Sequence, residues 1–200
     1  MIDSEFQKET KRLVLRQYKI EDYKIWRKTL LHLPPPQNPW DEEPRKEEEL
    51  DKEKFLQILE KQKELREKDA FYEFTAFQKE TGKMIGFVSI MDISRQVFQN
   101  GYLGYAVFSP YWRQGYGKEM VKAAVDIGFR TLRLHRLEAG IEPANIASIR
   151  LIKSLGFRKE GLSKGRLFLR GKWRDMELYA MTAEEWGVEG IVGHLMENRR

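Results

Sequence analysis

Residues 106–120 read AVFSPYWRQGYGKEM, and they join an apolar strand to a helix through a turn that contains Gly115 and Gly117. Such a turn bares several N–H groups at a helix N-terminus, where the helix dipole favours an anion. Glycine lets the backbone approach a phosphate without interference from a Cβ atom, and Arg113 and Lys118 add positive charge. The turn matches neither the P-loop nor the dinucleotide fingerprint, and a Gly-x-Gly turn alone is often an ordinary connection. The stretch predicts a strand–turn–helix unit with an anion site.

Alternating and helical patterns extend from this unit in both directions. We expect strands at 12–18, 70–78, 84–93, 100–110, 137–143 and two within 157–182, and helices at 20–31, 45–68, 116–132 and 145–155. The order β-α-α-β-β-β-α-β-α-β-β predicts an α+β fold with α/β/α layers. Its sheet of seven strands is expected to be mostly antiparallel, with one parallel crossover through the 116–132 helix.

The composition limits the kinds of reactive group, metal site and membrane segment that the chain can have. The 200 residues include no cysteine and three scattered histidines, so thiolate chemistry is excluded and no metal site is expected. The first residues lack the apolar core of a signal peptide, and no apolar run approaches the roughly 20 residues that cross a bilayer. We therefore expect a cytoplasmic protein without a membrane partner.

Charge is unevenly distributed along the chain. Residues 41–69 hold 12 acidic against 8 basic residues, and the remaining chain holds 28 basic against 19 acidic. The basic remainder suits an anionic ligand such as a phosphorylated cofactor, and it also suits an ordinary solubilising surface. RNA binding is not expected, because no RNA-binding motif accompanies the charge.

Four separated segments resemble the GNAT acetyltransferases, and in particular their RimJ/RimL-like branch of ribosomal-protein N-terminal acetyltransferases. They are Tyr111-Trp112 before the glycine turn, Leu134–Leu137, Asn145 with Ser148 in a helix that ends in Leu-Gly-Phe, and Gly171–Asp175. The resemblance runs from about residue 11 to residue 186. It implies one GNAT domain over 1–187, a C-terminal tail over 188–200, and a splayed pair of central strands.

The resemblance also implies acetyl-CoA as co-substrate and no metal. The pyrophosphate would lie over residues 113–118 and the pantetheine along the 105–108 strand edge. The cofactor-binding residues implied are Tyr105, Ala106, Val107, Phe108, Arg113, Gln114, Gly115, Tyr116, Gly117, Lys118, Asn145 and Ser148. Two positions depart from the family: Trp112 stands where most members have Arg or Gln, and Ile152 replaces a tyrosine that many use as acid.

The catalytic residues implied are Ser148, as the acid that protonates the leaving thiolate, and Glu138, as the base for the amine. Water is the alternative acid, and Asn145 and Ser148 also suit a plain helix cap and a solvent-facing serine. For Glu138 we favour a surface strand carboxylate over the role of base. Both roles stay open.

The acceptor implied is an amine, with a protein N-terminus favoured over a polyamine, amino sugar, amino acid or antibiotic. Trp40, in the proline-rich loop, is expected to form one wall of the acceptor site with the early helices and the 166–174 hairpin. A domain that binds acyl-CoA without turnover is the other alternative, and a homodimer is left open.

Overall fold

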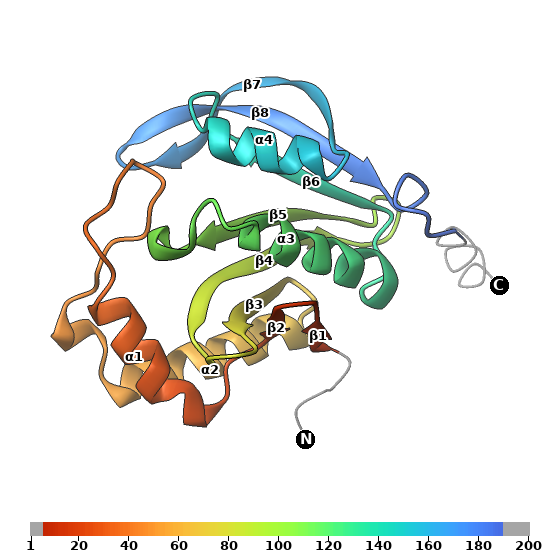
Figure 1. The fold of residues 1–200 in the computed structure, drawn as a ribbon. Coiled ribbons are helices and arrows are strands. Elements are labelled where there is room, and N and C mark those ends of the chain that lie inside the picture. The colour runs from red at the N-terminus through yellow and green to blue at the C-terminus, as the bar shows by residue number, and fades with distance from the viewer. Residues whose placement is uncertain (1–5, 190–200) are drawn as a thin grey trace.

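One sheet of eight strands runs through the described part of the computed structural model, residues 6–189. Its strands are β1 (Lys8–Glu9), β2 (Leu13–Arg16), β3 (Phe71–Gln78), β4 (Met84–Ser94), β5 (Asn100–Val107), β6 (Arg136–Ile141), β7 (Arg158–Leu169) and β8 (Lys172–Thr182). From edge to edge the order is β1-β2-β3-β4-β5-β6-β8-β7 (Figure 1). All neighbours are antiparallel except β5 and β6, which are parallel. This confirms the predicted mostly antiparallel sheet with one parallel crossover.

The predicted count of seven strands was wrong by one. The additional strand, β1, pairs with β2 through Lys8↔Leu15 and Glu9↔Val14 after a tight turn in which the Thr10 N–H donates to the Leu13 carbonyl at 2.9 Å. Two residues are too few to display a period-2 pattern, so the strand leaves no signal in the sequence.

Helices cover both faces of the sheet. They are α1 (Tyr23–Leu31), α2 (Lys52–Glu67), α3 (Tyr116–Asp126) and α4 (Ile146–Ser154). On β3, Phe74 belongs to the core that contains Met120 of α3, whereas the adjacent Glu73 accepts a hydrogen bond from Gln62 of α2 at 2.8 Å. Because neighbouring strand residues point to opposite faces, α2 and α3 lie on opposite sides. Figure 1 shows α3 and α4 together on one of them. The layering is α/β/α, as predicted.

Two helix boundaries differ from the prediction. The 45–68 helix begins later, because Asp51 caps α2 by accepting the Lys54 N–H at 2.8 Å, and a separate 3-10 turn precedes it. The 116–132 helix loses its α geometry after Asp126 and continues as a π turn, Ile127–Thr131. No helix of residues 6–189 is long and apolar enough to cross a membrane. The predicted tail lies, beyond residue 189, outside the described residues.

The two central strands diverge, and this divergence positions the site. Strands β5 and β6 pair only at Asn100↔Arg136, Gly101↔Leu137 and Tyr102↔Glu138. Beyond Tyr102, β5 keeps its partner β4 as far as Val107, but its other edge has no strand beside it. The expected splayed strand pair is therefore present.

Candidate active site

A cavity of about 810 Å³ opens where β5 and β6 diverge. It extends from the N-terminus of α3 to the β7–β8 hairpin. Its walls come from six parts of the chain: the 38–40 loop, β5 with the turn after it, the first turn of α3, the end of β6, α4, and the hairpin. Elements far apart in the sequence thus enclose one continuous space.

At the α3 end of the cavity, several backbone N–H groups have no partner within the helix. The first hydrogen bond of the helix runs from the Glu119 N–H to the Gly115 carbonyl at 3.2 Å, so the N–H groups of the preceding residues have no helical partner. Gly115 caps the helix with φ +82°, and Arg113 also has a positive φ of 58°. A turn that contains left-handed residues can gather successive backbone N–H groups around one concavity that suits an anion. Arg113 and Lys118 also line it.

A residue that the sequence did not single out fixes this turn. The Arg12 side chain donates to the Gln114 carbonyl at 2.9 Å and to the Glu119 carboxylate at 2.7 Å. Burial alone would raise the pKa of Glu119, but hydrogen bonds from Thr10 and Arg12 outweigh it and lower that pKa. Glu119 therefore stays ionised, and it joins the β1–β2 turn to the first turn of α3.

Gly117 provides the space that a phosphorylated ligand would need. A Cβ atom on Gly117 would lie 2.8 Å from Cδ1 of Leu151 and 3.5 Å from Cγ2 of Val107, and both of these residues line the cavity. A larger side chain would enter the space between β5 and α4. Glycine and the free N–H groups of α3 together fit a pyrophosphate.

The free edge of β5 forms the wall between β5 and β6. Tyr105, Ala106 and Val107 line the cavity along this edge, as expected for a strand that would bind pantetheine amides. Phe108 does not: its side chain is buried in the core and its N–H donates to the Ile85 carbonyl at 2.9 Å. Trp112 donates its indole N–H to the Val107 carbonyl, so this departure from the family pattern supports the turn itself.

Two hydroxyl groups face the same space from β5 and α4. Asn145 caps α4 by accepting the Ser148 N–H at 3.2 Å, and both residues line the cavity. The Tyr105 hydroxyl donates to the Ser148 carbonyl at 3.4 Å, and burial raises the pKa of Tyr105 to about 12. Tyr105 therefore keeps its proton at neutral pH. Sequence reasoning had placed Tyr105 only on the strand edge, whereas the structure also brings its hydroxyl to the Ser148 carbonyl.

Glu138 and Gln114 lie apart from the other predicted residues. Glu138 belongs to the last β5–β6 pair before the strands diverge and does not line the cavity. It accepts hydrogen bonds from Arg136 at 2.8 Å and Asn100 at 3.3 Å, and these contacts, against the effect of burial, lower its pKa. The geometry gives no support for Glu138 as base. The Gln114 side chain binds the Pro110 carbonyl at 3.1 Å and is also outside the lining.

The opposite end of the cavity is enclosed by the loop that contains Trp40 and by the hairpin. Trp40, Leu167, Leu169 and Arg170 line it together with Glu142, whose carboxylate accepts the Trp40 indole N–H at 2.8 Å. The loop and the 166–174 hairpin therefore form walls, as expected. The first two helices were expected to join them, but no α1 or α2 residue is in the lining.

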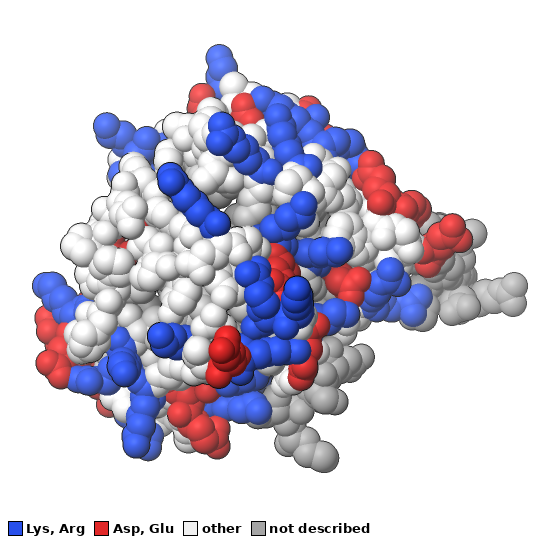
Figure 2. Space-filling model, in the orientation of Figure 1, with Lys and Arg blue, Asp and Glu red and all other residues white. Residues whose placement is uncertain are grey.

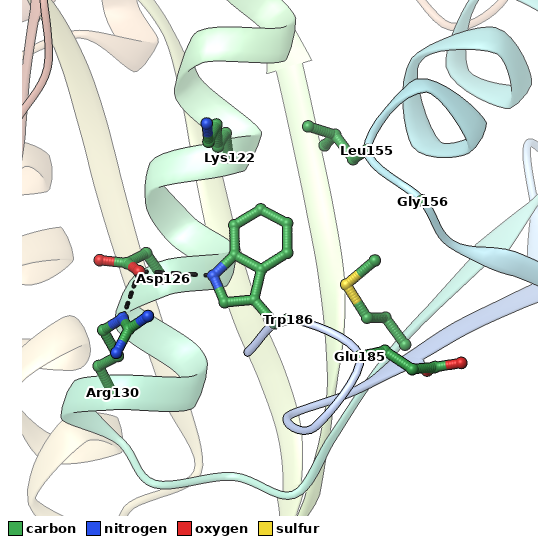
Figure 3. A pocket seen from close by; sticks show the side chains of 8 residues that line it. Lys122, Asp126, Arg130, Leu155, Gly156, Glu185 and Trp186 are labelled. Carbon is green, nitrogen blue, oxygen red and sulfur yellow. Dashed lines mark hydrogen bonds and ion pairs between the residues drawn. The ribbon is translucent and has the colours of Figure 1, made fainter. Parts of the chain in front are cut away.

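A second hollow, of about 670 Å³, lies at the other end of α3 (Figure 3). Its polar groups are largely paired. Asp126 accepts from Lys8 at 2.5 Å, Arg130 at 2.8 Å and the Trp186 indole N–H at 3.4 Å. Lys and Arg side chains gather around α3 and α4 on the face drawn in Figure 2. Within residues 6–189, no group of three or more potential metal ligands occurs.

The strand divergence, the glycine turn before α3 and the capped α4 define a class of acyltransferase architecture. The family model for the acetyltransferase (GNAT) domain matches residues 12–158, and the chain belongs to this family. The match spans the anion-binding turn, the diverging strands and α4.

Individual relatives agree with this assignment. The chain is 36% identical over 117 residues to the [ribosomal protein uS5]-alanine N-acetyltransferase of Escherichia coli, which covers 58% of this chain and 60% of that protein. The crystal structure of a ribosomal-protein-S5-alanine acetyltransferase from Vibrio fischeri is 28% identical, with a TM-score of 0.71 over 90% of this chain and 98% of that one.

The fold is also that of Mycobacterium smegmatis RimJ in complex with CoA-disulfide, which is 24% identical, with a TM-score of 0.72 over 94% of this chain and 90% of that one. The chain spans only 60–64% of the length of the curated relatives that it matches first.

Proposed function

We propose that the chain is an N-acetyltransferase that uses acetyl-CoA, and that its acceptor is the α-amine of a protein or peptide N-terminus. One observation carries the proposal: a single cavity joins the free N–H groups of α3 to the space between Trp40 and the hairpin. Such a cavity places an anionic cofactor and a second substrate in line. Positioning of the two reactants in the right geometry is a large part of what a direct transfer needs.

Each wall has a task in this reaction. The N–H groups of α3, with Arg113 and Lys118, hold the pyrophosphate. The free β5 edge pairs with the pantetheine amides, and one of its N–H groups stabilises the oxyanion that forms when the amine attacks the thioester. Ser148 protonates the leaving thiolate, and Tyr105 lies close enough to share that task.

The acceptor is inferred from the weakness of the available bases. An α-amine has a pKa near ~8, so a useful neutral fraction exists at physiological pH, whereas a lysine or polyamine amine near ~10 needs a stronger base. The lining contains no histidine and one carboxylate, Glu142. The relatives that act on ribosomal-protein alanine support the same choice.

Two matched peptides test the acceptor. One carries a free α-amine and a blocked lysine, and the other carries the reverse. We expect release of free coenzyme A thiol with the first peptide at a rate at least about tenfold higher. Preference for the lysine side chain, or for polyamines and amino sugars in a parallel screen, would contradict the α-amine. Tight acetyl-CoA binding without thiol release for every amine would mean that the domain only binds the cofactor.

A further inference from the structure

Glu142 is the one acidic residue in the lining of the cavity. It follows directly on the last residue of β6, Ile141. Its side chain is only 11% exposed. A carboxylate in that position is costly to bury unless cations or hydrogen-bond donors compensate its charge.

Residues from the two opposite walls provide this compensation. The Trp40 indole N–H donates at 2.8 Å from the loop, the Arg170 guanidinium forms an ion pair from the hairpin turn, and Nε of Arg174 lies 3.9 Å away. Although burial acts to raise the pKa of Glu142, the contacts with Trp40 and Arg170 lower it overall. Glu142 is therefore an anion at neutral pH.

Arg170 is the partner best able to leave. It lies in the turn between β7 and β8, at a φ of 50°, and its side chain is 40% exposed. When its guanidinium withdraws, water can solvate it at little cost. Glu142 would keep its hydrogen bond from Trp40 but lose its nearest cation, in a cavity wall that also contains Leu167 and Leu169.

We propose that Glu142 binds the ammonium form of the acceptor amine, and that Arg170 occupies this place while no acceptor is bound. The inference rests on the proposed function, because it concerns the acceptor end of the same cavity. The chemistry selects a primary ammonium whose adjacent carbon atoms are apolar, since Trp40 contacts the carboxylate and the hairpin leucines line the same cavity. The neutral amine that attacks forms when this ammonium loses a proton to water.

The ion pair predicts opposite effects for its two members. Glu142→Gln removes the anion and should raise the KM for the peptide acceptor at least about tenfold, with the KM for acetyl-CoA unchanged. Arg170→Ala removes the competitor and should lower the acceptor KM several-fold. Lys172→Ala is the matched control, because Lys172 is exposed on the same hairpin and forms no ion pair within the described residues, and it should leave both constants unchanged.

A structural clasp between the walls would behave differently. If Glu142→Gln and Arg170→Ala raise the acceptor KM alike, or if neither changes it, the inference is overturned. The pH dependence adds a second criterion: binding of an ammonium should weaken as pH rises through about 8, and Glu142→Gln should remove most of that dependence.

Direct binding separates failure of the inference from failure of the proposed function. Calorimetry with coenzyme A present measures binding of the free-amine peptide against the same peptide with an acetylated N-terminus. Binding of only the free amine, lost in Glu142→Gln, would uphold the inference even if the wild type turned over no substrate. Equal binding of both peptides to the wild type would contradict it.

Discussion

Helix α3 carries a hollow at each end, and the two hollows differ in chemistry far more than in size. Their volumes are about 810 Å³ at the N-terminal end and 670 Å³ at the C-terminal end. The first has helix N–H groups without helical partners and a glycine, Gly117, where a side chain would fill the space. The second has Asp126, which already accepts three hydrogen bonds.

The difference indicates which hollow is a site. Buried polar groups are normally paired within the protein, so donors left unpaired at a concave surface mark a place for a ligand. Groups that are already paired, such as the Asp126 carboxylate and the Trp186 indole, mark a place where parts of the fold pack against each other. Changes at the N-terminal end should therefore alter function with little effect on stability, and changes at the C-terminal end should do the reverse.

Gly117→Val should give the largest effect. The new Cβ would meet Leu151 at 2.8 Å, and its methyl groups would extend into the cavity beside Val107. We expect acetyl-CoA affinity to fall at least about 100-fold, or about 2.7 kcal/mol, by calorimetry. Gly161→Ala is the control, because a Cβ there meets no atom within 4 Å. Unchanged affinity in a folded Gly117→Val protein would remove the pyrophosphate from this turn.

Trp186→Ala addresses the other end of the helix. Trp186 is half-buried against Phe129, with ring centroids 6.5 Å apart, and its indole donates to Asp126. We expect the free energy of unfolding to fall by about 2 kcal/mol, below the range for a fully buried tryptophan. Urea unfolding measures this loss, and Trp186→Phe should recover most of it. A large drop in kcat/KM for the folded variant would mean that the second hollow takes part in function.

Ser148→Ala tests the proton donor at the functional end. If Ser148 meets the sulfur only as charge builds on it, the loss should appear as at least about a tenfold fall in kcat, with the acetyl-CoA Kd unchanged. Tyr105→Phe, in the same assay, measures the share of the neighbouring hydroxyl. If Ser148→Ala keeps wild-type turnover and Tyr105→Phe loses it, Tyr105 is the proton donor. Wild-type turnover in both would leave water as the acid.

Local patterns were sufficient for most of the fold. Period-2 strands, the Asn145 cap and the helix end at Gly156, with its φ of +95°, all act within a few residues, so the sequence contains them. Strand β1 and the π turn after Asp126 depend on tertiary pairing and packing, and a single sequence holds no local signal for either.

The strand–turn–helix unit at the α3 end of the cavity was predictable for the same reason, since its turn and helix are contiguous. The end of the cavity near Trp40 and the hairpin was less predictable. Glu138 was a candidate base because of its place on a central strand, but the cavity begins only beyond the Tyr102↔Glu138 pair. Glu142, four residues on, meets Trp40 from 102 residues away. Such a contact depends on how the loop folds back across the sheet.

The smallest effect should come from Asp126→Asn, and it should depend on pH. Burial acts to raise the pKa of Asp126, but hydrogen bonds from Lys8, Arg130 and Trp186 lower it. A carboxylate whose pKa is lower in the folded state stabilises the protein above its unfolded pKa of about 4. That contribution is lost as pH falls through the folded pKa.

Lys8 and Arg130 are about half exposed, so solvent screens both ion pairs and the gain at neutral pH should stay below about 1 kcal/mol. Urea unfolding should show wild type more stable than Asp126→Asn at pH 6, with the gap closing by pH 3 and shrinking in high salt. A gap that persists undiminished at pH 3 would mean that Asp126 acts through packing. We distinguish the two ends of α3 by whether their charged groups are paired. That pairing would then not explain how the C-terminal end of α3 is stabilised.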